Sequence, residues 1–164
     1  MIQILVGCIS SGKTTYCRKR AQEGWIIMTD DAIVDAVHGG DYTLYDKALK
    51  PLYKSIENHI VHMAVAMGKN VVIDRGLNIS AISRQRWITM SRSLDMPISA
   101  VIFEKFDPGI HARRRFDADP RGLSFEYWCQ VANKHEAVYE RPDLSEGYES
   151  IEEIKWEKNR WNTN

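Results

Sequence analysis

The sequence predicts an α/β fold in which helices cover both faces of a mostly parallel β-sheet. Two observations carry this prediction. Short apolar runs alternate with longer helical stretches along most of the 164 residues, and this alternation is typical of a parallel sheet. The first apolar run, residues 2–6, leads directly into the glycine-rich segment GCISSGKT at residues 7–14. A strand followed by such a loop and then a helix is the setting in which phosphates bind to backbone N–H groups.

The elements follow from the spacing of apolar residues and from turn residues. The expected strands are residues 2–6, 25–28, 71–74 and 98–103, with a short last strand within 146–151. The expected helices are residues 13–23, a short one ending near 37, then 45–67, 79–94, 108–116 and 124–140. Ser80 is a candidate N-cap for the helix at 79–94. Pro51 lies inside the stretch 45–67 and marks either a helix start or a kink.

The chain length suits one hydrophobic core, and no repeat or long linker divides it. We therefore expect a single domain over residues 1–154 and an exposed C-terminal tail over residues 155–164. Lysine and arginine number 22, and aspartate and glutamate also number 22, so the formal net charge is zero. This balance argues against a protein that coats long stretches of nucleic acid through bulk charge.

Three cysteines without a Cys-x-x-Cys spacing indicate neither a disulfide framework nor a zinc site. A reducing, cytoplasmic setting fits this cysteine usage. No apolar run approaches the roughly 20 residues that span a bilayer, so we expect no membrane segment.

Residues 7–14 match the Walker A pattern G-x-x-x-x-G-K-[ST] at every position. Glycines allow the backbone to approach phosphates, and the following helix presents its positive N-terminal end to them. The lysine places a charge at the β- and γ-phosphates, and the threonine that follows offers a hydroxyl to Mg²⁺. The motif predicts a P-loop NTPase or kinase-like three-layer sandwich that binds ATP and Mg²⁺. The expected nucleotide-binding residues are Gly7, Ser10, Ser11, Gly12, Lys13, Thr14 and Thr15.

Asp30 and Asp31 follow the second apolar strand. Transfer of a γ-phosphoryl group to a hydroxyl calls for a carboxylate that takes the hydroxyl proton. Either aspartate could serve as this general base, and the other could contact the acceptor. The alternative is that the pair caps the next helix, because aspartate is a favoured N-cap residue.

Asp74 ends the apolar run VVID, which is the Walker B arrangement that helps to hold Mg²⁺. The same carboxylate could instead contact the acceptor, orient a neighbouring arginine, or simply end the strand. Arg75 comes next and points either into the same cleft, where it would bind substrate, or away from it.

Arg113, Arg114, Arg115 and Arg121 form the densest basic segment of the chain. Arginines over a transferring phosphoryl group stabilise its spreading charge. Successive helical residues point about 100° apart, so only one or two of the first three can face ATP. Arg113 and Arg114 are the candidates. The proline and glycine beside Arg121 suit a mobile lid. The alternative is a solvated basic face paired with nearby aspartates.

Taken together, these segments resemble the phage polynucleotide kinase type of P-loop kinase. The resemblance rests, in chain order, on GCISSGKT, TDDAI, VVIDRGLN and RRRFDADPRG, and the ending YERPDLSEGYESI is similar to related small kinases. The resemblance implies transfer of the γ-phosphate of ATP to a 5′-OH of DNA or RNA. It assigns Lys13 and Thr14 to ATP and Mg²⁺, Asp30 to general base, Asp74 to the acceptor side and Arg121 to the lid.

Two departures from the family pattern concern the site. The family carries an arginine three residues after the general base, and this chain has Ile33 there. Arg75 could supply the missing charge. The lid also has extra residues between Arg115 and Arg121, which leaves the correspondence of the three preceding arginines open.

Three functions remain from the sequence. The first is a polynucleotide 5′-hydroxyl kinase. The second is a kinase of a small acceptor such as a nucleoside, nucleotide, sugar or antibiotic, which the zero net charge and Ile33 favour. The third is a nucleotide-dependent switch or ATPase, but the sequence offers no obvious glutamine or glutamate just after the Asp74 strand to position an attacking water.

Overall fold

A computed structural model of the chain describes residues 1–119 and 122–155. Five parallel strands form one sheet in the order β2-β3-β1-β4-β5. The strands are β1 (Ile2–Val6), β2 (Ile26–Thr29), β3 (Val71–Asp74), β4 (Ile98–Phe103) and β5 (Ser150–Ile154). Parallel neighbours need crossover connections, and helices supply most of them. The predicted parallel α/β fold is therefore confirmed.

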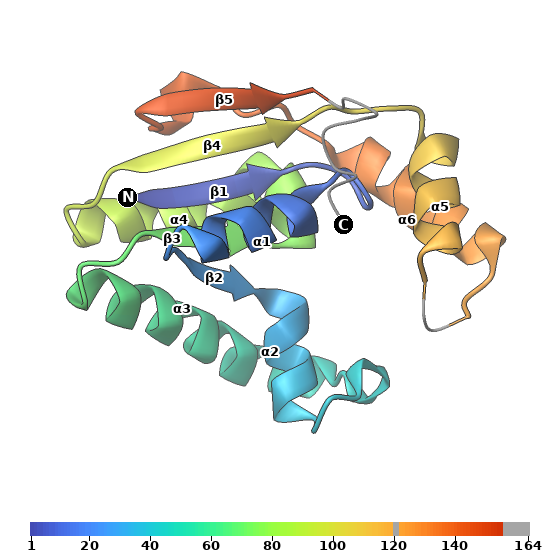
Figure 1. The fold of residues 1–164 in the computed structure, drawn as a ribbon, viewed down its shortest axis with the longest axis horizontal. Helices are drawn as coiled ribbons and strands as arrows, with labels where there is room; N and C mark the ends of the chain where they lie inside the picture. Colours follow the sequence, from blue (N-terminus) through green and yellow to red (C-terminus); the bar gives the residue numbers. More distant parts are fainter. Residues whose placement is uncertain (120–121, 156–164) are drawn as a thin grey trace.

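The helices lie in three places relative to the sheet (Figure 1). One face carries α1 (Lys13–Gln22), and the other carries α2 (Asp30–Val37), α3 (Lys50–Ala66) and α4 (Ala81–Ser93). Beyond the carboxyl ends of the strands, α5 (Pro108–Asp117) packs against α6 (Phe125–Val138). Short 3-10 turns are η1 (Tyr42–Leu44), η2 (Lys47–Leu49), η3 (Gly76–Ile79) and η4 (Leu144–Glu146). No helix of the described residues is long and apolar enough to cross a membrane.

Alternation along β1 divides the core into two clusters. Ile2, Ile4 and Val6 pack with residues of α2, α3 and α4 on one face. Leu5 packs with Tyr16 and other residues on the α1 face. Successive strand residues point to opposite faces, so a five-residue run that is buried throughout must lie between two helical layers. This is the three-layer sandwich.

Two element boundaries differ from the sequence prediction. The stretch 45–67 is helical only from Lys50, because Asp46 caps the turn η2 and Pro51 occupies the first turn of α3, where no N–H is required. The last strand begins at Ser150 rather than near residue 146. Asp143 and Glu146 form a capping box there, so this segment is a 3-10 turn.

The apolar stripe of α3 does not coincide with its buried face. Leu52 and Met63 are 45% and 47% exposed, whereas Tyr53 and Glu57 are buried. Part of the stripe instead lines an apolar hollow of about 370 Å³ between α2, α3 and β2. The predicted tail lies outside the described residues from residue 156 onward.

Candidate active site

The loop between β1 and α1 has the backbone that the Walker A pattern predicts. Gly12 immediately precedes α1 with a φ of 101°, and Ser10 also has a positive φ of 51°. A Cβ on Gly7 would lie 2.5 Å from Ser11 Oγ and 2.9 Å from Phe103 Cβ. Only glycine fits at position 7 without moving the loop.

Lys13 lies over this loop from the first turn of α1. Its Nζ donates to the carbonyl oxygens of Gly7 and Cys8, each at 2.8 Å. Thr14, the next residue, is exposed. The loop therefore gathers a lysine, a threonine hydroxyl and a helix N-terminus at the carboxyl end of the central strand, a combination that suits the phosphates of a nucleotide.

The register of the sheet brings the second and third strand ends together. Thr29 pairs with Asp74 across β2 and β3, so the next residues, Asp30 and Arg75, are neighbours. Arg75 Nε lies 3.4 Å from Asp30 Oδ2. The arginine thus points toward the predicted base rather than away from it.

The N-cap of α2 is Thr29, not an aspartate. Its side chain accepts a hydrogen bond from the backbone N–H of Ala32 at 3.3 Å. Asp30 follows as the first helical residue, and its Oδ1 accepts from the N–H of Asp31 at 3.1 Å. Because Thr29 already caps the helix, the Asp30 carboxylate is not required for that purpose.

Glu57 of α3 and Arg86 of α4 complete a charge network that the sequence did not indicate. Arg75 Nε lies 3.2 Å from Glu57 Oε1, and Arg86 Nη2 lies 2.8 Å from Glu57 Oε2. The Glu57 side chain is only 2% exposed. A buried carboxylate needs compensating charge, and here two arginines supply it. A single glutamate in a long helix reads as a solvent-facing residue, so no local pattern could have identified it.

Burial raises the pKa of Asp30 to about 7, with the Asp31 carboxylate as the second cause and the Arg75 guanidinium opposing both. A carboxylate whose pKa lies near neutrality can accept a proton more readily than an ordinary aspartate. This property suits a general base.

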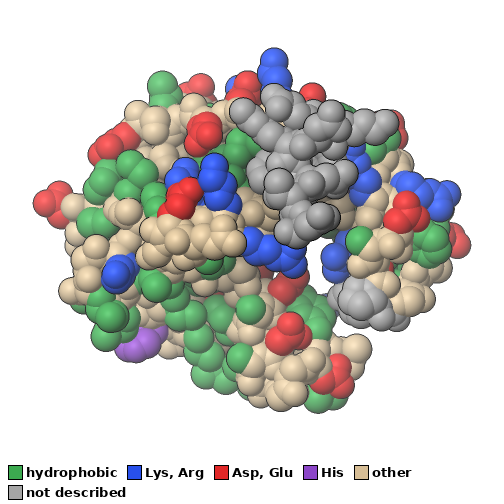
Figure 2. Space-filling view, viewed as in Figure 1, with side chains coloured by type: hydrophobic (Ala, Val, Ile, Leu, Met, Phe, Trp, Pro, Cys, Tyr) green, Lys and Arg blue, Asp and Glu red, His purple; other side chains and the backbone are tan. Residues whose placement is uncertain are grey.

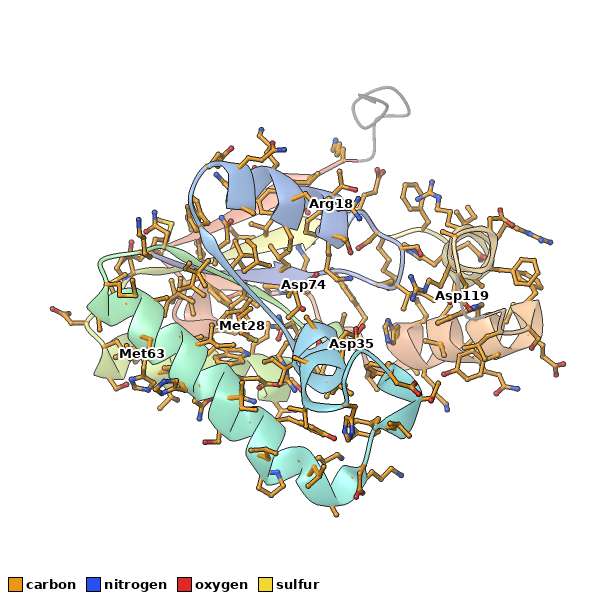
Figure 3. The ribbon with its side chains drawn as sticks, turned by 60° about the horizontal axis from the view of Figure 1, so that its bottom comes forward. Arg18, Met28, Asp35, Met63, Asp74 and Asp119 are labelled. Carbon is orange, nitrogen blue, oxygen red and sulfur yellow. The ribbon has the colours of Figure 1, made fainter. Side chains whose placement is uncertain are left out.

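Asp74 lies at the same edge, at the end of β3. Figure 3 shows it between α1 and α2. Burial raises its pKa, and Lys13 opposes this shift. The thiol of Cys17 donates to Asp74 Oδ2 at 3.7 Å, and burial raises the pKa of that thiol to about 12. The described residues contain no group of three or more His, Cys, Asp or Glu side chains able to hold a metal ion. A Mg²⁺ site here would depend on few protein ligands and on nucleotide oxygens.

The three consecutive arginines of α5 each lie over an aromatic ring. Arg113 covers Phe125 at 4.4 Å, Arg114 covers Phe106 at 4.6 Å and Arg115 covers Trp128 at 4.9 Å, each measured to the ring centroid. Arg113 also lies 4.0 Å from Asp117. Burial lowers the pKa of His111 in the same helix, and the charges of Arg114 and Lys13 lower it further. Arg121 lies outside the described residues.

Three tyrosines stack on one another near the aspartates. The rings of Tyr42 and Tyr45 lie 6.3 Å apart at 11°, and those of Tyr45 and Tyr53 lie 5.7 Å apart at 25°. Burial and the Asp31 carboxylate raise the pKa of Tyr42. On the face shown in Figure 2, the molecule is hollowed between the part that carries α2 and the part that carries α5 and α6, and charged side chains surround this cleft.

The predicted residues therefore fall into two groups. One group lies together at the carboxyl edge of the sheet: Lys13, Asp30, Asp31, Asp74 and Arg75. Helix α5, which carries the three consecutive arginines, lies on the other side of the cleft (Figures 1 and 2). In open α/β sheets ligands bind at this edge.

Comparison with known proteins supports the fold. Residues 2–119 match the family described as AAA domain. A candidate kinase from Chloroflexus aurantiacus superposes with a TM-score of 0.69 at 12% identity, over 94% of this chain and 84% of that chain. Chaetomium thermophilum Kti12, in complex with ADP-AlF3, gives 0.58 at 15% identity, over 98% and 92%. A gluconokinase from Sinorhizobium meliloti gives 0.56 at 16%, over 93% and 81%. No curated protein matches by sequence. The fold is that of the P-loop kinases.

Proposed function

Since this chain belongs to the AAA domain family, we propose that its P-loop kinase fold serves an ATP-dependent phosphotransferase that phosphorylates a hydroxyl of a small acceptor. The observation that carries the proposal is the position of Asp30, whose carboxylate lies at the loop edge of the sheet, is not used as a helix cap and has a pKa near 7. Residues 1–154 form the kinase domain in this proposal.

The chemistry follows from the side chains at the strand ends. Asp30 takes the proton of the acceptor hydroxyl while the acceptor oxygen bonds to the γ-phosphorus. The bond between that phosphorus and the β–γ bridging oxygen breaks, and ADP leaves. Lys13 and the loop N–H groups hold the phosphates in place. Arg114, with Arg113 or Arg121, would stabilise the charge of the transferring group from the lid side.

Mg²⁺ fits this site through Thr14 and Asp74. Thr14, which is exposed, lies in α1 directly after the phosphate loop, and Asp74 ends β3, which pairs with the strand that precedes the loop. When bound, the ion would neutralise charge on the phosphate oxygens. Asp74 would hold it directly or through its waters.

Two observations favour a small acceptor. The chain has no net charge, so it lacks the bulk attraction that polyanions exert on basic proteins. The gluconokinase among its structural neighbours acts, by its name, on gluconate, which is a small molecule.

A 5′-OH end of DNA or RNA is the second candidate. The stacked rings of Tyr42 and Tyr45, with Tyr42 beside Asp31, favour it, because aromatic side chains hold unpaired bases by stacking with little sequence preference. The resemblance to polynucleotide kinases in segment order points the same way.

A transfer assay with γ-labelled ATP tests both candidates. The acceptor panel contains gluconate, shikimate, nucleosides, nucleotides, and DNA and RNA oligonucleotides with 5′-OH ends. We expect label on a small acceptor, with the oligonucleotides inert. Asp30→Asn should lose transfer but retain ADP binding by calorimetry. Label on oligonucleotides alone would select the second candidate, and hydrolysis of ATP without any labelled acceptor would refute a kinase.

A further inference from the structure

We propose that Arg75 is an acceptor-binding residue whose guanidinium holds an anionic group, a carboxylate or a phosphate, that the acceptor carries close to its reacting hydroxyl. This inference rests on the proposed function and deepens it by naming the chemical class of the acceptor. Two observations support it: Nε of Arg75 faces two carboxylates, and the two terminal nitrogens make no hydrogen bond with the described residues.

Arg75 comes closest to both neighbouring carboxylates through Nε. Its Nε lies between Asp30 Oδ2 at 3.4 Å and Glu57 Oε1 at 3.2 Å. Among the described residues, neither terminal nitrogen, Nη1 or Nη2, makes a hydrogen bond, and Nε is the arginine atom nearest to the carboxylate in both ion pairs. Neither of these atoms is buried without a partner, although the side chain as a whole is only 11% exposed. The terminal fork is thus the part that reaches the surface.

A guanidinium fork that is fixed at its base is a receptor for planar or tetrahedral oxyanions. Two parallel N–H donors match the oxygens of a carboxylate or a phosphate. Fixing Nε in advance reduces the loss of side-chain freedom on binding. Because Nε lies beside the Asp30 carboxylate, an anion on the fork would lie within a few bonds of a hydroxyl that Asp30 deprotonates.

The charged cluster around Arg75 lowers the stability of the fold, and this cost suggests a role in binding a ligand. Arg75 Nε, Glu57 Oε2 and Arg86 Nη1 are all buried and lack a partner with hydrogen-bond geometry, although charge contacts join the three side chains. Buried polar atoms without hydrogen bonds destabilise a protein and are concentrated at functional sites. Glu57, itself 1% exposed, acts as the support that holds both arginines beside the base.

Matched pairs of acceptors test the assignment by binding. The probes are shikimate against methyl shikimate, gluconate against sorbitol, and adenosine 3′-monophosphate against adenosine. Each is titrated calorimetrically into the protein saturated with ADP and Mg²⁺, so that the phosphate loop is filled. We expect the charged member of at least one pair to bind about tenfold to a hundredfold more tightly than its neutral partner. The carboxylate and phosphate pairs distinguish the two sources of the anion.

Variants connect this preference to the arginine. Arg75→Gln should abolish it, and Arg75→Lys, which keeps the charge beside Asp30 and Glu57, should reduce it about tenfold. Arg92→Gln is the control, because Arg92 is an exposed arginine near the C-terminus of α4. Circular dichroism establishes that each variant is folded. Equal binding within every pair, no binding of any charged probe, or a preference that persists in both Arg75 variants would overturn the proposal.

The transfer assay separates failure of this inference from failure of the proposed function. If the protein phosphorylates a neutral acceptor as well as a charged one, the proposed role of Arg75 is refuted and the proposed kinase function is retained. Arg75-dependent binding of a charged probe, with no phosphoryl transfer to any acceptor, supports the anion site and argues against the kinase.

Discussion

Replacing Asp30 by asparagine should stabilise the protein, and the gain should grow with pH. Burial and the neighbouring Asp31 raise the pKa of Asp30 from 3.8 to about 7. Between these two values the folded protein retains a proton that the unfolded chain has released. The folded state then binds more protons, so the free energy of unfolding of the natural protein falls as the pH rises from about 4 through about 7. Asparagine cannot ionise, so the free energy of unfolding of the variant does not fall with pH for this reason.

The size of the effect follows from the shift. One pKa unit corresponds to about 1.4 kcal/mol, and about two units of the shift lie above pH 5. Between pH 5 and pH 8, the advantage of Asp30→Asn over the natural protein should therefore widen by about 2 to 3 kcal/mol. The Asp30 side chain is 27% exposed. Solvent screening therefore reduces the effect, and we expect a stability change toward the lower end of this range.

Urea-induced unfolding at pH 5 and pH 8, followed by circular dichroism, measures the difference. Asp35→Asn removes a carboxylate from the same helix without touching Asp30 or Arg75, and it controls for the change in net charge. A stability gap between the natural protein and Asp30→Asn that stays constant with pH would refute the reasoning. In that case Asp30 would be an ordinary exposed carboxylate and a poor choice of base.

Three further outcomes follow from the same structure. In transfer assays across pH, the rate should rise about tenfold per unit below pH 7 and level off above it, because only ionised Asp30 accepts the proton; a flat profile would exclude it as the base. Gly7→Ala, whose Cβ would lie 2.9 Å from that of Phe103, should lower the transfer rate by roughly a hundredfold through displacement of the loop, and an unchanged rate would contradict this. Arg84→Met removes a fully buried partner of Glu146 at 2.6 Å, and urea unfolding should show a loss of about 3–5 kcal/mol; a loss below about 1 kcal/mol would mean that this pair does not stabilise the fold.

The elements that the sequence predicted best are those whose signal is local. The strands at 71–74 and 98–103 were predicted with the boundaries that the structure has, because each is an apolar run bounded by turn residues. The prediction was wrong where side chains cap the backbone. At Asp46 and Asp143, hydrogen bonds to nearby N–H groups form 3-10 turns in stretches that propensity assigns to a helix or a strand.

The residues of the site also differ in whether the sequence alone could identify them. The phosphate loop is contiguous, so spacing alone identifies Lys13 and Thr14. The network that joins Asp30, Arg75 and Glu57 depends on the pairing of β2 with β3 and on the face that α3 buries. Neither can be read from spacing, and the apolar stripe of α3 points to a different face from the one that carries Glu57.

This network explains why the chain can have Ile33 at the position where the polynucleotide kinase pattern has an arginine. Ile33 is 5% exposed and packs in the core beside the apolar hollow that Ile56 and Ile60 also line. An arginine at this position would lose solvent on an apolar face, which is costly. Arg75 provides a cation from the neighbouring strand instead, where Glu57 is available to hold it. We infer that in this chain the charge beside the base comes from the residue that follows β3 rather than from α2. Any acceptor that it binds would therefore lie over the third strand rather than against the second helix.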